Sequence, residues 1–226
     1  MGAKIGCLHA HHDNITYIND ALAAPDREFI HFVDPGLMQR ITADPGFAQG
    51  GGAEKVLEQL NWIAASNVDA ILITCTNYIA LLDEAQLALQ LPIIKIDEPF
   101  FAQICSTAAP QTILFSNPAT VEGTMKRLYD YAELHGHSLP DIQSYTIANT
   151  FELFMQGYKQ KYIAELTRAI QQLCQREQSS VAPRELSVAQ LSMVEAAQEV
   201  ERERPQLQIA NPLRTLADHL DYVLSV

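Results

Sequence analysis

The chain has 226 residues, of which 48% are hydrophobic and 19% are charged, and this composition excludes a disordered or fibrous protein. Its 15 basic and 27 acidic residues give a net charge of −12. Nucleic acids and anionic membrane surfaces attract clustered lysine and arginine, so neither is expected as a partner.

Apolar runs and cysteines predict where the protein resides. The longest apolar runs, such as Ala70–Thr74 and Ala109–Phe115, are too short to span a bilayer. The first residues do not show the apolar stretch and cleavage site of a signal peptide, so we expect a cytoplasmic protein. The four cysteines stand far apart without a CxxC pair, which predicts free thiols.

Taken in chain order, short runs rich in β-branched residues alternate with longer segments of helical period. This alternation predicts βα units around parallel sheets. The expected strands are Lys4–Ala10, Phe29–Asp34, Ala70–Thr74, Ile93–Asp97, Thr112–Ser116, Ile142–Ala148, Val188–Leu191 and Leu207–Ile209. The expected helices are Ala53–Ser66, Thr120–His135, Phe151–Gln175 and Pro212–Leu224. The connection from Pro35 to Gly52 is long, and we expect it to be a flexible active-site loop.

The pattern of strands and polar turns occurs twice. Ile5–Ala10 and Ile113–Asn117 both lead into polar turns, and Cys75 and Ser192 each follow a predicted strand. The repeat predicts two similar α/β domains, one of residues 1–98 with 207–226 and one of residues 99–206.

The strongest chemical signal lies in residues 71–78. A buried strand ends at Cys75, which is followed by Thr76 and Asn77 and then by an expected helix. The free N–H groups and the dipole at a helix start favour negative charge, so this position predicts a thiol with a lowered pKa. The alternative is that Cys75 is a small core residue, as free cysteines often are.

These residues resemble the aspartate/glutamate racemase superfamily. Cys75-Thr76-Asn77 is similar to the first cysteine motif of that family, and the segment from Ser116 to Thr120 resembles its loop that holds the substrate carboxylate. The resemblance covers most of the chain and implies two pseudo-symmetric, doubly wound parallel-sheet domains with the site in the cleft between them. Ser192 takes the place of the second cysteine in this comparison, and His9-Ala10 stands where several members carry Asp-Ser.

The resemblance implies a cofactor-independent racemase or isomerase that acts on the carbon alpha to a carboxylate. Cys75 and Ser192 would be catalytic, without a metal ion, and the substrate would be a small carboxylate. A homodimer or a higher homo-oligomer is expected. The substrate-binding residues would be His9, Thr76, Asn77, Ser116, Asn117 and Thr120.

The expected catalytic pair is unequal. An alkyl hydroxyl is a much weaker acid than a thiol, so Ser192 would relay a proton poorly. A one-thiol decarboxylase of the same superfamily and a non-catalytic small-molecule-binding relative therefore remain alternatives.

A run of histidines suggests a different kind of site. His9 and His11, two residues apart on a predicted strand, would point the same way and could begin a metal site. No matching histidine is recognised at another strand end, so loop polarity or hydrogen bonding to substrate is the favoured role for both.

Overall fold

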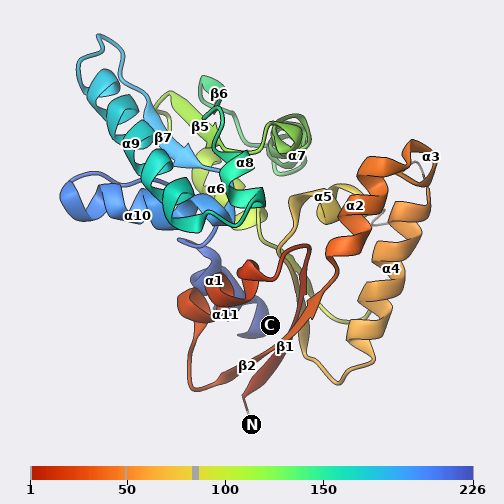
Figure 1. The fold of residues 1–226 in the computed structure, drawn as a ribbon. Coiled ribbons are helices and arrows are strands. Elements are labelled where there is room, and N and C mark those ends of the chain that lie inside the picture. The colour runs from red at the N-terminus through yellow and green to blue at the C-terminus, as the bar shows by residue number, and fades with distance from the viewer. Residues whose placement is uncertain (1, 49, 83–86, 226) are drawn as a thin grey trace. The chain divides into compact units, whose positions relative to one another are not determined.

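The computed structural model describes residues 2–48, 50–82 and 87–225 and divides into two compact units (Figure 1). The first unit comprises Met1–Glu98 and Leu216–Val226, and the second comprises Pro99–Thr215. The chain passes from the first unit to the second after Glu98. The return crossing follows Thr215 rather than position 206, because Ile209 is buried in the core of the second unit and Val188 N donates to Ala210 O at 2.9 Å.

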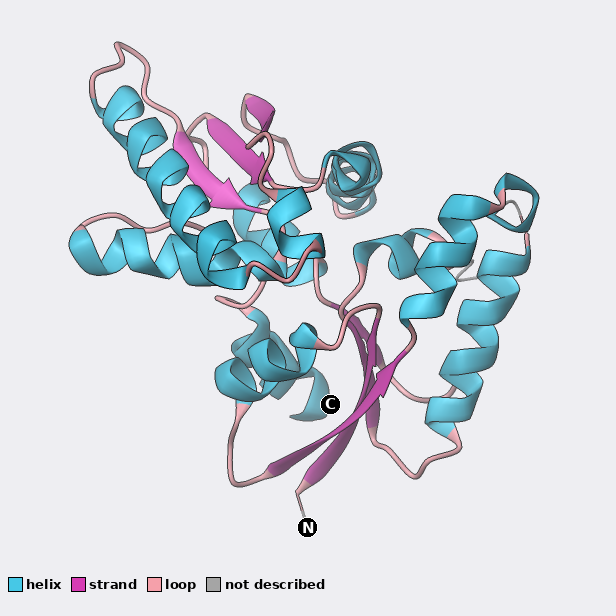
Figure 2. Ribbon diagram, viewed as in Figure 1, coloured by secondary structure: helices cyan, strands magenta, loops and turns pink. Residues whose placement is uncertain are grey.

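The first unit contains a four-stranded parallel sheet with the order β2-β1-β3-β4. Helices α1 and α11 cover one face of this sheet and α4 covers the other (Figure 2). The strands are β1 (Ala3–His9), β2 (Arg27–Val33), β3 (Ala70–Ile73) and β4 (Ile93–Lys95). The helices are α1 (Asp13–Leu22), α2 (Pro35–Ala43), α3 (Pro45–Ala48), α4 (Gly51–Ala64), α5 (Thr76–Ala80) and α11 (Leu216–Ser225).

The apolar pattern explains how the elements of this unit pack. All four residues of β3 are buried, as expected for an interior strand covered on both faces. Helix α4 buries Val56, Leu60 and Ile63 along one stripe. Gly6 on β1 lets α4 approach closely, since a Cβ at that position would lie 2.3 Å from Ile63 Cγ2.

The second unit contains a three-stranded parallel sheet with the order β6-β5-β7. Its strands are β5 (Gln111–Phe115), β6 (Ile142–Thr146) and β7 (Glu185–Val188). Its helices are α6 (Glu98–Cys105, whose first residue is counted with the first unit), α7 (Val121–Leu134), α8 (Phe151–Met155), α9 (Lys159–Gln178) and α10 (Val194–Glu203), with short 3₁₀ turns η2 (Pro118–Thr120) and η3 (Leu191–Met193).

The predicted fold class is confirmed, because every strand pairing in the described ranges is parallel and helices flank both sheets. Several predicted boundaries were wrong. Gly157, with φ +77°, separates α8 from α9 where one long helix was expected. The expected flexible loop after Pro35 instead folds into α2 and α3. Strand β7 ends at Val188, and the segment expected as a last strand forms only a bridge from Ala210 to Ser187.

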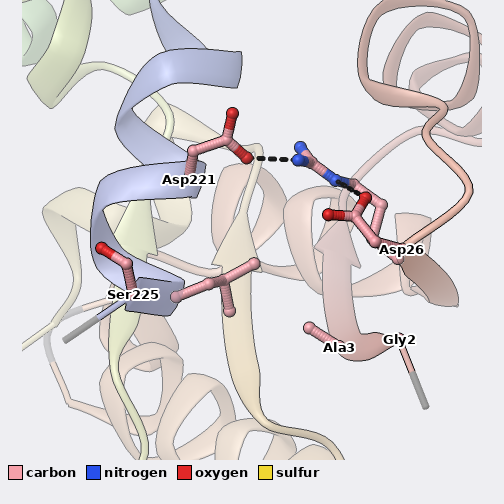
Figure 3. Close-up of a pocket in the computed structure, with 7 residues that line it drawn as sticks. Gly2, Ala3, Asp26, Asp221 and Ser225 are labelled. Atoms are coloured by element: carbon pink, nitrogen blue, oxygen red, sulfur yellow. Dashed lines mark hydrogen bonds and ion pairs between the residues drawn. The ribbon is translucent and has the colours of Figure 1, made fainter.

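The C-terminal helix belongs to the first unit, where it buries Leu216 and Leu220 and forms an ion pair with β2. Asp221 on α11 pairs with the Arg27 guanidinium, which also lies 3.5 Å from Asp26 through its Nε (Figure 3). These residues border a hollow of about 750 Å³ beside Gly2 and Ala3. The hollow lies at the amino ends of β1 and β2, so it is at the opposite end of the sheet from Cys75. Within the described residues, no helix is both long and apolar enough to cross a membrane.

Candidate active site

Cys75 lies two residues beyond β3 and is the N-cap residue of α5. Burial raises the pKa of its thiol to about 11. Hydrogen bonds from the backbone N–H groups of Tyr78 and Asn77 oppose this rise, and the charge of Asp97 adds to it. The prediction of a lowered pKa was therefore wrong, because desolvation outweighs the amides at the start of the helix. At neutral pH the free protein holds Cys75 as a protonated thiol.

The helix that follows Cys75 is anchored to the neighbouring strand end. Tyr78 is buried, and its hydroxyl donates to the backbone carbonyl of Asp34, just after β2. The Asp34 side chain accepts from Leu37 N at 3.1 Å and caps α2. These contacts fix the position of the cysteine relative to the carboxyl ends of β2 and β3.

His9 occupies the end of β1 and is fully buried. Its Nδ1 lies 2.8 Å from Thr74 Oγ1, and its Nε2 lies 2.9 Å from His31 Nδ1. Burial lowers the pKa of His9 to about 3, and His31 adds to this effect. Both ring nitrogens thus contact protein groups, and in this structure His9 orients Thr74, the neighbour of Cys75. His11 lies beyond the end of β1 and pairs with Asp13 at 3.6 Å.

The polar group at the carboxyl end of the second sheet is organised by Gln190. Its Oε1 accepts hydrogen bonds from Ser116 N at 2.7 Å, Ser116 Oγ at 3.0 Å and Asn117 N at 3.0 Å. Gln190 therefore holds the loop after β5 against the loop after β7. Sequence reasoning missed this residue.

A chain of hydroxyl groups continues from Ser116. The buried Tyr162 of α9 places its hydroxyl 2.9 Å from Ser116 Oγ and 2.7 Å from Ser192 Oγ. Tyr162 lies on the buried stripe of α9 with Leu166 and Ile170, and its hydroxyl joins the two serines.

The predicted carboxylate-binding loop is shaped by its own side chains. Asn117 Oδ1 accepts from Ala119 N at 3.0 Å, and Thr120 Oγ1 donates to Asn117 O at 2.9 Å. These bonds form the turn η2 between β5 and α7. The structure thus brings Ser116, Asn117, Thr120 and Ser192 into one unit, and His9, Cys75, Thr76 and Asn77 into the other.

Strand register relates the two halves residue by residue. β1 and β5 occupy corresponding places, because each is flanked by two strands of its own sheet. Just after β3, Thr74 N donates to Leu8 O of β1, and just after β7, Ala189 N donates to Leu114 O of β5. The next residues, Cys75 and Gln190, are therefore equivalent. Ser192 lies two residues further on, within η3, and is the counterpart of Asn77. The register thus corrects the expectation that Ser192 takes the place of the second cysteine. Counting from the last paired residue of each strand would have revealed this.

No protein-family model matches the chain, and no curated protein sequence matches it. Solved structures do match. The aspartate racemase of Picrophilus torridus has a TM-score of 0.68 at 11% identity, over 99% of this chain and 95% of that chain. The allantoin racemase of Klebsiella pneumoniae has a TM-score of 0.64 at 20% identity, over 99% and 88%. A glutamate racemase of Bacillus anthracis has a TM-score of 0.64 at 15% identity, over 99% and 82%. The chain therefore shares the fold of these racemases.

Proposed function

We propose that this chain is a cofactor-independent enzyme of the racemase type, which moves a proton at the carbon alpha to a carboxylate with Cys75 as its acid and base. The observation that carries the proposal is the placement of Cys75. It follows a buried strand at the carboxyl edge of a parallel sheet, where ligands bind in open α/β folds. The fold shared with aspartate, glutamate and allantoin racemases supports the same reading.

The environment of Cys75 suits exchange with a weakly acidic C–H group. In the acid direction, the S–H bond breaks and its proton forms a C–H bond at the α-carbon of an enolate, leaving a thiolate. In the reverse direction, the thiolate takes the α-proton. Burial raises the pKa of the thiol and makes the thiolate a stronger base, while the N–H groups of Asn77 and Tyr78 stabilise the charge on sulfur.

The remaining site residues are proposed to bind the substrate. Thr76 and Asn77 lie in the first turn of α5, directly after Cys75. In the second unit, the Asn117 side-chain amide can donate to a carboxylate oxygen, and the Ser116 and Thr120 hydroxyls would do so after turning away from Gln190 and from the Asn117 carbonyl. Such local donors are required because the net charge of −12 repels an anionic substrate.

Gln190 favours a second candidate, a one-thiol decarboxylase. An amide in the position equivalent to Cys75 cannot exchange a proton near neutral pH, whereas racemisation needs one donor on each face of the α-carbon. Ser192 would have to supply that second donor. Decarboxylation needs only one proton donor. The C–C bond breaks, CO₂ leaves, and the electron pair remains on the α-carbon. Cys75 then delivers its proton to that carbon, and solvent returns a proton to the sulfur.

The test is a set of substrates incubated with the enzyme in D₂O. The set contains both enantiomers of aspartate and glutamate, hydantoins, and substituted malonates. Racemisation with deuterium at the α-carbon supports the first candidate, and CO₂ release from a malonate with one deuterium gained supports the second. Binding of these compounds without exchange or CO₂ release would contradict both and favour a non-catalytic binding protein.

A further inference from the structure

Three side chains of the types that can ligate a metal ion lie together on the face of the first sheet that α1 covers. Cys7 and His9 are two residues apart on β1, so they point to the same face. His31 on β2 pairs with Cys7 in the parallel register and therefore points to that face too. Their ligand atoms all lie within 4.8 Å of one another. His31 is the neighbouring-strand histidine that sequence analysis did not recognise.

The hydrogen bonds around His9 are compatible with a metal-binding tautomer. Thr74 Oγ1 accepts from Asn14 Nδ2 at 3.1 Å and lies 3.2 Å from Leu8 O and 2.8 Å from His9 Nδ1. When the Thr74 hydroxyl donates to Leu8 O, its oxygen accepts from His9 Nδ1, and the neutral His9 ring keeps a lone pair on Nε2 for a metal ion.

The His31 ring is oriented in the complementary way. Its Nε2 lies 3.1 Å from Asn19 Oδ1, a carbonyl oxygen that can only accept, so Nε2 carries the proton. The lone pair of His31 is then on Nδ1, 2.9 Å from His9 Nε2. In the His9 tautomer with its proton on Nδ1, the two lone pairs face each other, and a metal cation between them would bind both. Burial lowers the pKa of both rings, which opposes a proton in that place.

We propose that Cys7, His9 and His31 bind a divalent transition-metal ion of the Zn²⁺ type. Imidazole and thiolate ligands suit Zn²⁺, with Zn–N bond lengths of about 2.0–2.1 Å and Zn–S bond lengths of about 2.3 Å. Tetrahedral binding would separate the two nitrogens by about 3.3 Å, slightly more than the present 2.9 Å. On binding, the Cys7 S–H bond breaks, its proton goes to solvent, and the thiolate binds the metal.

The surroundings of the three residues fit this assignment. Metal-bound histidines usually donate their other ring N–H to a second group, which fixes the ring. Here Thr74 Oγ1 is placed to accept from His9 Nδ1, and Asn19 Oδ1 accepts from His31 Nε2. His9 and Cys7 are fully buried while His31 is partly exposed, which leaves a route for the ion from the His31 side. A water molecule would complete the four ligands.

The test uses the full chain after treatment with a chelator, with Zn²⁺ followed by calorimetry and Co²⁺ followed by absorption. We expect one ion per chain, and a thiolate-to-Co²⁺ charge-transfer band that Cys7→Ala removes. His31→Gln should weaken Zn²⁺ binding at least about tenfold. The matched control is His135→Gln, at the C-cap of α7 in the other unit, which should leave binding unchanged.

A thermal-unfolding measurement on the wild-type chain tests the proposal even if a variant fails to fold. Zn²⁺ should raise the Tm of the wild-type chain, because an ion that binds only the folded state stabilises it. The absence of saturable binding, or binding that His31→Gln leaves intact, would overturn the proposal. These measurements do not depend on turnover, so their failure is distinct from failure of the proposed enzymatic function.

Discussion

Cys75 and Gln190 occupy equivalent backbone positions in the two halves of the chain. Each follows a residue whose N–H donates to the central strand of its sheet, Thr74 to Leu8 in one half and Ala189 to Leu114 in the other. One position carries a thiol, and the other carries an amide that holds the loop after β5. The same backbone position thus carries a different side chain with different contacts in each half.

Replacement of Gln190 by alanine should destabilise the second unit. Gln190→Ala removes the acceptor for Ser116 N, Ser116 Oγ and Asn117 N, and we expect a loss of about 1–3 kcal/mol in the free energy of unfolding. Gln190→Glu is the matched control, because it keeps an acceptor oxygen and should lose less. Urea unfolding measures both. Equal stability of Gln190→Ala and wild type would show that the three hydrogen bonds have little net effect.

A cysteine at position 190 tests the register directly. Gln190→Cys places a thiol at the position equivalent to Cys75 and should increase the rate of two-way racemisation of any substrate that exchanges. Ser192→Cys puts the thiol two residues away and should have a smaller effect. Chiral chromatography of the products measures both rates. A larger gain in Ser192→Cys would contradict the register and would favour Ser192 as the counterpart of the second cysteine.

The hydroxyl of Tyr162 should contribute to stability as well as to the site. Tyr162→Phe removes the group between Ser116 and Ser192, and we expect a loss of about 1–2 kcal/mol from the free energy of unfolding. Ser192 is only partly buried, so Ser192→Ala should cost less. Chemical denaturation of the two variants provides the comparison, and a reversed order would contradict the described network.

The pKa of Cys75 predicts slow alkylation at neutral pH. A pKa of about 11 instead of 9.0 lowers the thiolate fraction at pH 7 about 100-fold. The rate of labelling of Cys75 by iodoacetamide, followed by peptide mass spectrometry, should rise with pH toward a midpoint near 11. Rapid labelling at pH 7 would show that the free protein already holds a thiolate.

Acid should weaken one contact at the edge of the second sheet. The Arg184 side chain hydrogen-bonds to Asp141 and lowers the pKa of this carboxyl below its ordinary value of 3.8. The stabilisation is complete above the unfolded pKa and is lost as the pH falls through the lower folded value. Asp141→Asn should therefore reduce the pH dependence of Tm below pH 4. An unchanged dependence would place the acid-sensitive contact elsewhere.

The sequence predicted the parallel α/β halves because β3 and β5 are short, apolar and bounded by polar turns. It could not predict the pKa of Cys75, because desolvation depends on the packing around the thiol, which opposes the local effect of the amides. It missed His31 because the pattern of one strand does not reveal which residue lies beside Cys7. The motif comparison pointed to Ser192 because it favours a nucleophile-like residue. Strand register, which the motif does not contain, places Gln190 at the position equivalent to Cys75.

The central claim is that Cys75 exchanges the α-proton, and its most direct test is deuterium incorporation from D₂O, measured by NMR for Cys75→Ser and Cys105→Ser beside wild type. Cys105 is a matched control because it is a partly buried cysteine on α6 and not a residue of the proposed site. With a substrate that the wild type exchanges, Cys75→Ser should lose at least about 10²-fold in rate, and Cys105→Ser should keep it. Full exchange by Cys75→Ser, or no exchange by the wild type with any acidic amino acid, hydantoin or substituted malonate, would contradict the account.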